Sequence, residues 1–484
     1  MIRQILVNKY VQFGMIFLSK LLMIYYFAFF ESSNWDQIKL FFAGGDALSY
    51  YGPFENLIQH GVYAYGNSLE PYAGRMPHYG FIYYLFRFFG DQALAFNCMV
   101  ILQIAVEALS IIYLAKLAQM IVTKGKEVTY YLILILGVLN ASHSIWSRYI
   151  LTESLSISCF VMYCYFLFKY LKEGGTKQLL LVGLSIGLVV VLRPYLIVLF
   201  FPIGLVYLWR VYKQEISIQE LIKNVAIICI PMFVLLSPWM IRNANTFGKF
   251  IPLQDDVQAG YKYTDSYYAM WDFIAAWGGS IQSWDKRAAG CIFEPRFDQD
   301  CTFEYPEYAF TSSYTREDVE QLRADYIDLC ITYDKDLDQE VTFRFRELEE
   351  AFKKERPIRY YLISPISLSL DMVLHSGSYY VSIPKVGILK WIGIAFKALQ
   401  SLMYYLILIF GIFGLLKKWK DVYFLNLLFT PLFILILFGV ILKAPEFRFF
   451  IHAYPVCLLA SVIFVQFISE KLKLDRFKLF SKIS

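Results

Sequence analysis

Charged residues are scarce in this sequence. Asp, Glu, Lys and Arg make up 18% of its 484 residues, whereas hydrophobic residues make up 58%. A soluble fold of that composition would expose a very large apolar surface, so the sequence excludes an ordinary water-soluble enzyme. It also has no internal repeat and no low-complexity segment, so a repeat architecture is not expected. A membrane protein is the remaining class.

Histidine and cysteine are few, and their positions indicate little chemistry. The five histidines match no spacing of metal ligands, so they predict no metal centre by themselves. Three of the eight cysteines, Cys291, Cys301 and Cys330, lie in one stretch between apolar segments, where an oxidising compartment would permit one disulfide. Their pairing stays open.

Long apolar runs dominate the sequence. Crossing a bilayer takes roughly 20 apolar residues in a helix, because every backbone polar group must find its partner internally. Ten segments fit this pattern: 5–30, 93–121, 128–142, 152–171, 178–192, 195–211, 224–241, 390–416, 422–442 and 447–469. Two of them, 128–142 and 178–192, are short, so the count could change by one or two. We predict an all-α polytopic membrane protein with about 10 transmembrane helices.

Basic residues predict the orientation of the chain. With ten spans, all the Lys and Arg clusters, such as those near Lys124 and Lys417, fall on one side, which is then cytoplasmic together with both termini. The opposite side is acidic, since residues 245–385 carry 24 Asp and Glu against 15 Lys and Arg. The net charge of +5 therefore reflects orientation and attraction to membrane lipids, not a nucleic-acid partner. We predict a multi-pass plasma-membrane protein.

The spans and loops divide the chain into three predicted parts. Residues 1–242 form an N-terminal transmembrane module whose first outer loop, 31–92, is unusually rich in Tyr and Gly. Interfacial helices are expected in that loop. Residues 243–389 form a small acidic, aromatic-rich extracytoplasmic domain before the last three helices. Residues 390–484 hold the last three helices and a basic cytoplasmic tail.

The first outer loop brings an acid and bases to the membrane surface. In "GGDALSYYGPFENLIQHGVYAYG", Asp46 precedes a predicted amphipathic interfacial helix that ends at Gly61. Downstream, "YAGRMPHYGFIYYLFRFFG" carries Arg75 and His78 ahead of a second apolar face. Taken singly, each residue has an ordinary explanation, with Asp46 as a helix cap and Arg75 as a contact to lipid headgroups.

Several such stretches occur in an order that resembles a known superfamily. The loop above is followed by "YILTESLSISCF", "GLSIGLVVVLRPYLIVLF", "SPWMIRNANTFGKFIPL" and "PEFRFFIHAYPVCLLA". Together these motifs resemble the GT-C glycosyltransferases, which use lipid-phosphate-linked sugars. Within them the chain is similar to the branch of protein O-mannosyltransferases and lipid A aminoarabinose transferases. Residues 255–385 show no such resemblance, so the acceptor is not indicated.

The resemblance implies roles for particular residues. Asp46 matches the first-loop acid of the family and is expected to be the general base, with Glu153 as a second acid that positions the acceptor or a divalent metal. A metal held by these two acids stays open. Tyr50 and Tyr63 are expected to position the acceptor. The residues expected to face the donor phosphate are Arg75, His78, Arg193, Arg448 and His452.

Other polar residues have simpler alternatives. Glu153 in "LTES" could equally begin a helix, and Arg193 could anchor at the interface. Arg242 and Asn243 are expected to close a helix. Glu107, near the middle of the second span, should be neutral or partnered, because an unpaired charge there costs at least a few kcal/mol.

The function predicted from these observations is transfer of one hexosyl or pentosyl unit. The expected donor is a polyprenyl-phosphate sugar, the acceptor is an extracytoplasmic glycan, lipid or protein of the cell envelope, and the reaction is inverting. The alternatives are a transporter or flippase and a polymerase of lipid-linked envelope polysaccharides. A transporter should show two similar halves with paired broken helices, which the long first loop and the acidic late stretch interrupt.

Overall fold

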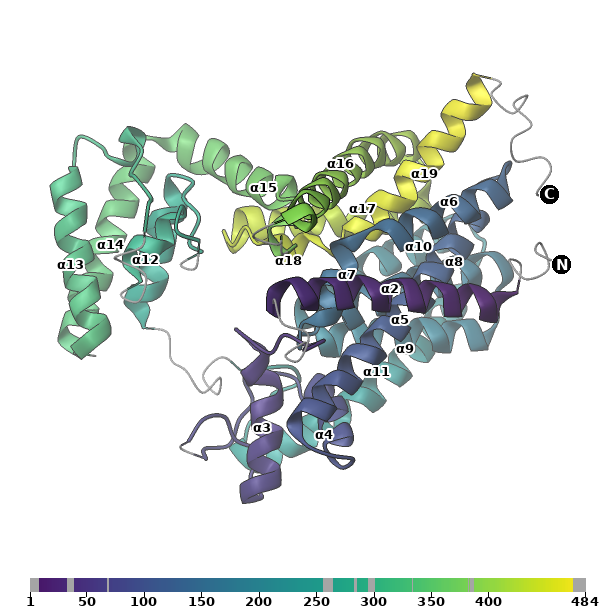
Figure 1. The fold of residues 1–484 in the computed structure, drawn as a ribbon, viewed down its shortest axis with the longest axis horizontal. Coiled ribbons are helices and arrows are strands. Elements are labelled where there is room, and N and C mark those ends of the chain that lie inside the picture. Colours follow the sequence, from purple (N-terminus) through teal and green to yellow (C-terminus); the bar gives the residue numbers. More distant parts are fainter. Residues whose placement is uncertain are drawn as a thin grey trace. The chain divides into compact units, whose positions relative to one another are not determined.

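A computed structural model describes residues 8–32, 39–67, 69–255, 264–282, 285–294, 301–332, 334–381, 383 and 387–472. Regular structure in these residues is helical, apart from two isolated β-bridges that join Phe42 to Tyr149 and Ala64 to Pro71. The predicted all-α, polytopic class is confirmed (Figure 1).

The chain forms two compact units. Unit 1 comprises Met1–Gly260, Ser376–Pro431 and Ile451–Ser484, and unit 2 comprises Tyr261–His375 and Leu432–Phe450. Unit 2 thus differs from the predicted domain 243–389, because it also takes in the segment around residues 432–450, which packs on the helix Ser364–Leu374. Hydropathy could not reveal this, since that segment is as apolar as a membrane span.

The described chain has eight helical segments long and apolar enough to cross a membrane. These are α2 (Lys9–Ser32), α5 (Gln92–Ile121), α8 (Glu153–Glu173), η2 with α10 (Pro194–Leu199, Phe200–Tyr212), α11 (Ile218–Phe247), α16 (Gly387–Lys418), α17 with η9 (Val422–Ile434, Leu435–Ile441) and α19 (Tyr454–Lys471). A ninth span is possible if α6 (Lys126–Leu139) and α7 (Ala141–Arg148), which bend by 47°, count as one. The helix α9 (Thr176–Leu192) is apolar but shorter. Each of the ten predicted segments therefore contains an apolar helix. The two segments that are short in sequence, 128–142 and 178–192, contain α6 and α9, which are each too short to cross a membrane alone.

Small residues allow the helices of unit 1 to approach closely. A Cβ atom added at Gly183 of α9 would lie 2.2 Å from the carbonyl oxygen of Ile228 in α11. A Cβ at Gly414 of α16 would lie 2.1 Å from the carbonyl oxygen of Ala460 in α19. Such contacts are typical of membrane helices, whose association depends on close packing of small residues.

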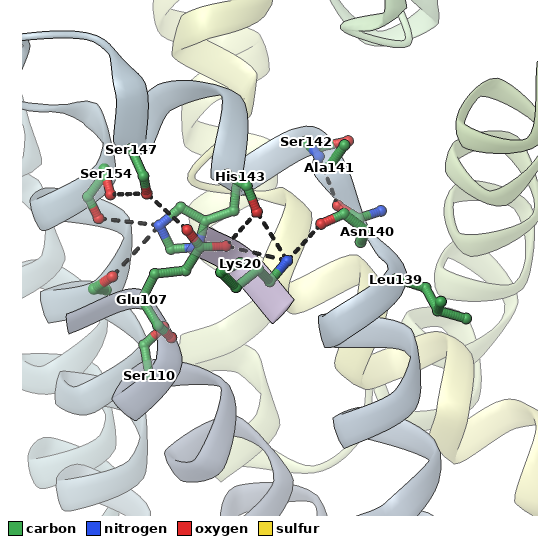
Figure 2. Close-up of polar contacts among 12 residues, drawn as sticks. Lys20, Glu107, Ser110, Leu139, Asn140, Ala141, Ser142, His143, Ser147 and Ser154 are labelled. Carbon is green, nitrogen blue, oxygen red and sulfur yellow. Dashed lines mark hydrogen bonds and ion pairs between the residues drawn. The ribbon is translucent and has the colours of Figure 1, made fainter. Parts of the chain in front are cut away.

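A buried ion pair stabilises the bend between α6 and α7 (Figure 2). Lys20 Nζ of α2 lies 3.2 Å from Glu107 Oε1 of α5, and it donates hydrogen bonds to the Asn140 carbonyl at 2.7 Å and to Ser144 Oγ at 2.8 Å. The prediction that Glu107 is partnered is confirmed. The bend interrupts the ladder of helical hydrogen bonds at Asn140. Lys20 Nζ supplies a further hydrogen bond to the Asn140 carbonyl there.

Two short helices of the first outer loop lie at the end of unit 1 where α5 begins (Figure 1). They are α3 (Ala47–His60), which ends at the left-handed Gly61 as predicted, and α4 (His78–Arg87). A Cβ at Gly80 of α4 would lie 2.2 Å from the carbonyl oxygen of Tyr50 in α3, so the two helices cross almost in backbone contact. This tight crossing brings Tyr50 of α3 and the start of α4 together.

Unit 2 has its own aromatic core. Its helical segments are α12 (Asp265–Ala276), η4 (Ala289–Phe293), η6 (Glu307–Ala309), α13 (Arg316–Thr332), α14 (Lys335–Glu355), η7 (Arg359–Ile363), α15 (Ser364–Leu374), η9 (Leu435–Ile441) and α18 (Phe447–Phe450); η8 (Ser378–Tyr380) belongs to unit 1. Phe273, Phe293 and Phe345 pack together at its centre. Among the described residues none of the eight cysteines forms a disulfide, and burial together with a contact to Cys301 raises the pKa of Cys291 to about 12. The possible disulfide of the outer stretch is therefore not formed in this structure.

Candidate functional site

Asp46 stands directly before α3, but its carboxylate does not cap that helix. In the described chain the residue occupies the N-cap position without a capping hydrogen bond from its side chain. Its backbone carbonyl instead accepts hydrogen bonds from Ser49, from N at 3.0 Å and from Oγ at 2.6 Å. The turn is thus closed by the backbone of Asp46 and the Ser49 side chain, so the simple alternative of a carboxylate cap does not apply.

Arg75 lies beside the same turn. Its Nε is 3.4 Å from Ser49 Oγ, and its guanidinium carbon is 5.7 Å from the centre of the Tyr50 ring. A guanidinium over an aromatic face at this distance is held by a cation–π interaction. We call Asp46, Ser49, Tyr50 and Arg75 the outer cluster.

A second group of residues lies at the start of α8. Glu153 is fully buried and forms an ion pair with Arg193, which follows α9. Apart from that ion pair, neither Glu153 oxygen has a hydrogen-bond donor among the residues that the structure describes. The alternative reading of Glu153 as the start of a helix is also correct, since it is the first residue of α8. A buried carboxylate with open acceptor positions is nevertheless unusual, because such groups are normally satisfied.

His452 joins this second group from the C-terminal part of unit 1. Its Nε2 lies 2.7 Å from Ser156 Oγ, and its Nδ1 lies 3.4 Å from the Tyr195 hydroxyl. Ser156 Oγ also donates to the Glu153 carbonyl at 3.0 Å. We call Glu153, Arg193, Ser156 and His452 the inner cluster. Three predicted site residues thus come together: Glu153 from the start of α8, Arg193 from the end of α9, and His452 from the turn before α19.

Tyr79 connects the two clusters, and sequence reasoning missed it. Its ring centre is 5.5 Å from that of Tyr50, and its hydroxyl donates to Gln103 Oε1 at 3.1 Å. Burial raises the pKa of Tyr79 well above its usual value, and the negative charge of Glu153 raises it further. Tyr79 therefore lies within electrostatic reach of Glu153 while touching the outer cluster. In a loop with many tyrosines, the sequence carried no signal to single it out.

A backbone bridge also links the two halves of the site. Phe42 N donates to the Arg148 carbonyl at 2.9 Å, and Ile150 N donates to the Phe42 carbonyl at 2.9 Å. Phe42 precedes Asp46 by four residues, and Ile150 precedes Glu153 by three. The two acids are thus attached to opposite sides of one short parallel pairing.

Other predicted site residues have different surroundings. His78 Nε2 lies 2.9 Å from the Leu235 carbonyl, and burial lowers the pKa of its imidazole. Tyr63 packs between Phe54 and Trp239 below the guanidinium of Arg242, which is 5.3 Å from the Tyr63 ring centre. Arg448 belongs to unit 2, where it pairs with Glu446.

Arg242 attaches the last turns of α11 to the first loop, and Asn243 attaches them to the chain that follows the helix. Arg242 Nη1 donates to the Tyr72 carbonyl at 2.8 Å, and Asn243 Nδ2 donates to the Ile251 carbonyl at 3.1 Å. Both residues thus have satisfied polar contacts, as predicted, but they do not close the helix, because α11 continues to Phe247 and ends at the left-handed Gly248. As for metals, no set of three or more His, Cys, Asp or Glu side chains in the described ranges is placed to hold an ion.

Residues 78–241 match the family model of the dolichyl-phosphate-mannose-protein mannosyltransferases. The match begins at α4 and continues into α11, so it contains Tyr79, Glu153 and Arg193. The predicted resemblance to GT-C glycosyltransferases is confirmed. The mannosyltransferase model does not reach Asp46, Arg75 or His452. No curated protein matches the chain.

Two crystal structures of ArnT from Cupriavidus metallidurans are similar to this chain. The apo structure has 11% sequence identity to this chain and a TM-score of 0.38, and the match covers 95% of this chain and 77% of the ArnT chain. The structure bound to undecaprenyl phosphate has 13% identity and a TM-score of 0.39, with 94% and 77% covered.

Proposed function

We propose that this protein is a membrane glycosyltransferase that transfers one sugar from a polyprenyl-phosphate donor to an extracytoplasmic acceptor with inversion. The observation that carries the proposal is the buried Glu153–Arg193 pair, with open carboxylate positions, inside the segment that matches the mannosyltransferase family. A lipid-linked sugar has its phosphate at the membrane surface, so chemistry on it belongs in a loop that rests on the helical bundle.

In the proposed reaction the acceptor hydroxyl oxygen attacks the anomeric carbon of the donor sugar. The bond between that carbon and the phosphate oxygen breaks, and polyprenyl phosphate leaves with the electron pair. Asp46 takes the proton of the hydroxyl as the new bond forms. A single displacement inverts the configuration at the anomeric carbon.

Charge distribution suggests the roles of the remaining residues. Negative charge grows on the departing phosphate, and we assign Arg75 of the outer cluster and Arg193 of the inner cluster to neutralise it. Glu153 holds Arg193 in place and positions the acceptor, while Tyr50 and His452 support these groups through Arg75 and Ser156. Because the His78 ring is engaged with Leu235, we do not assign phosphate binding to it. Phosphate binding by Arg448 stays a prediction.

The first experiment identifies the substrates. Mass spectrometry of cell-envelope glycans, with and without this protein, should reveal one missing sugar and the acceptor that carries it. If the envelope glycans are unchanged while a lipid-linked sugar accumulates on one side of the membrane, the flippase alternative replaces the proposal.

The second experiment tests the base. Asp46→Asn keeps the size of the side chain but cannot accept the proton, so transfer should fall by roughly 10² to 10⁴ with donor binding retained. Glu70→Gln, which changes an exposed carboxylate of the same loop, is the matched control and should transfer normally. Both are measured on purified protein in lipid nanodiscs. Near-normal transfer by Asp46→Asn would remove the general base from the mechanism.

A further inference from the structure

An open cavity with mixed polar and apolar lining lies in the predicted first outer loop, apart from the two clusters. It has a volume of about 560 Å³ and lies between α3, the turn at residues 64–67 and the start of α5. The polar and aromatic residues that characterise its lining are Tyr51, Asn56, Gln59, Tyr65, Asn67 and Gln92. Nothing in the proposed reaction uses these side chains.

The cavity is on the far side of α3 from Asp46. Its residues Leu48, Gly52, Glu55 and Gln59 follow the spacing of three and four that places side chains on one helical face. Since each residue turns the helix by about 100°, Leu48 points about 160° away from the direction of Asp46. The cavity and the outer cluster are thus separated by one helix, whose diameter is about 10 Å with side chains.

Hydrogen bonds fix the walls of the cavity. Asn56 Nδ2 donates to the carbonyls of Ala64 at 2.8 Å and Gly66 at 2.9 Å, which fastens the turn to α3. Arg87 Nε forms an ion pair with Glu55 Oε1 at 2.7 Å. A site with walls fixed in this way is preorganised, so binding need not supply the cost of ordering them.

The chemistry of the lining indicates the class of ligand. The amides of Gln59, Asn67 and Gln92 offer donors and acceptors in the same small space, which suits a molecule with many hydroxyl groups. Two tyrosines, Tyr51 and Tyr65, add aromatic surface on which the apolar face of a sugar ring can pack.

The charge of the lining argues against an anion. Glu55 and Asp91 are acidic and Arg87 is the one basic lining residue, and Arg87 is already paired with Glu55. A phosphate would therefore meet a net negative wall. The volume lies within the range of ordinary small-molecule sites, about 300 to 1,000 Å³.

We infer that this cavity binds neutral sugar units of the acceptor, so that the acceptor is a glycan of more than one unit. The inference rests on the proposed function and narrows its acceptor from glycan, lipid or protein to glycan. A bound oligosaccharide would hold its preceding units in the cavity and pass its terminal hydroxyl around α3 to Asp46.

Binding without turnover tests the inference. The probe is the pool of oligosaccharides released from the cell envelope by mild acid, observed by saturation-transfer NMR with the full-length protein in nanodiscs. Wild-type protein should transfer saturation to sugar-ring protons, and Asp46→Asn should do so equally. Gln59→Leu combined with Asn67→Leu should weaken binding at least about 10-fold, because it removes two of the amides but keeps the side-chain volume. Gln321→Leu in unit 2, also an exposed amide, is the control and should bind normally.

The results separate this inference from the proposed function. The inference is overturned if the wild-type protein gives no saturation transfer, if the double variant binds as well as wild type, or if inorganic phosphate displaces the sugars. Binding of deglycosylated envelope peptides in place of sugars would overturn it too. Sugar binding together with normal transfer by Asp46→Asn would instead contradict the general base and leave the cavity as a glycan site.

Discussion

Unit 1 contains two buried ion pairs between a glutamate and a base, and they differ in how completely they are satisfied. In the pair of Lys20 and Glu107, each carboxylate oxygen also accepts a hydrogen bond of 2.7 Å, from Ser144 at Oε1 and from Ser147 at Oε2 (Figure 2). In the pair of Arg193 and Glu153, the described chain supplies no hydroxyl or amide donor to the carboxylate.

The two pairs differ in how the cost of burying their charges is offset. Removing two charges from water is costly, and the cost is offset only when further hydrogen bonds satisfy both partners. Lys20 and Glu107 meet that condition, and they hold three helices at a bend. Glu153 does not meet it, and in the proposed reaction its open acceptor positions would receive a hydrogen bond from a substrate hydroxyl. Buried charge alone therefore does not indicate a site, and the proposal rests on the open acceptor positions of Glu153.

The largest expected effect is on the labelling of lysines, which should be all or none. It tests the side of the membrane on which Glu153 lies. The positive-inside pattern predicts that Lys124 and Lys417 are protected from a membrane-impermeant amine reagent in intact cells, whereas Lys335 of unit 2 reacts. Peptide mapping by mass spectrometry reads the modified lysines. Labelling of Lys417 from outside would reverse the orientation and place Glu153 on the cytoplasmic side.

Breaking the satisfied pair should mainly cost stability. Lys20→Met leaves the buried Glu107 carboxylate without its cation, so the free energy of unfolding should fall by about 3 to 5 kcal/mol. Unfolding in detergent micelles, followed by circular dichroism, gives the measurement. Adding Glu107→Gln to Lys20→Met removes the uncompensated charge and should recover much of the loss. A single variant as stable as wild type would show that the pair carries no structural role.

Changing the unsatisfied pair should mainly cost activity. Glu153→Gln keeps the shape of the side chain but loses the charge that holds Arg193, so transfer should fall by roughly 10- to 100-fold. Its stability should change less than that of Lys20→Met, because Arg193 retains 11% side-chain exposure and can reach water. Transfer and thermal unfolding are measured on the same preparation. If Glu153→Gln lost as much stability as Lys20→Met, the two pairs would not differ in their contribution to stability.

The smallest effect concerns an exposed carboxylate in unit 2. Glu355 accepts hydrogen bonds from Ser313 Oγ at 2.5 Å and from Ser312 Oγ at 2.7 Å, which lower its pKa to about 2 from an ordinary 4.5. Because the folded-state pKa is lowered, these bonds add stability above pH 4.5, and the contribution is lost as the pH falls towards 2. Amide exchange at Ser312 and Ser313 should therefore stay slow at pH 4. Rapid exchange already at pH 4.5 would contradict this assignment.

Hydropathy predicted the helices well because spanning a bilayer imposes a long apolar run. The same rule does not show to which compact unit an apolar segment belongs, so the assignment of residues 432–450 to unit 2 was not predicted. Glu107 was recognised as needing a partner, but Lys20 lies far away in sequence inside another span. Long-range pairs of this kind depend on which helix faces meet, and no local pattern contains that information.

The candidate site shows the same limit. Glu153, Arg193 and His452 were named from motifs and lie in one cluster, whereas Tyr79 could be found only from its position between Tyr50 and Glu153. The cavity beside α3 also depends on a turn closed by Asn56, whose two acceptors are backbone carbonyls. Every residue has a backbone carbonyl, so the sequence does not indicate which carbonyls Asn56 contacts. The cavity could therefore not be predicted from the sequence.

The short pairing between Phe42 and Tyr149 also determines which part of the loop can move. Both its hydrogen bonds attach the entrance of the loop to the chain just before α8, and Gln103 Nε2 holds the same segment through the Ser147 and Tyr149 carbonyls, at 2.9 and 3.1 Å. The segment that joins Phe42 to Asp46 therefore cannot move away as a lid while these hydrogen bonds persist. In the proposed enzyme, Asp46 and Glu153 would therefore stay on the fixed side of the site, and only parts of the loop outside this pairing could move to admit a substrate.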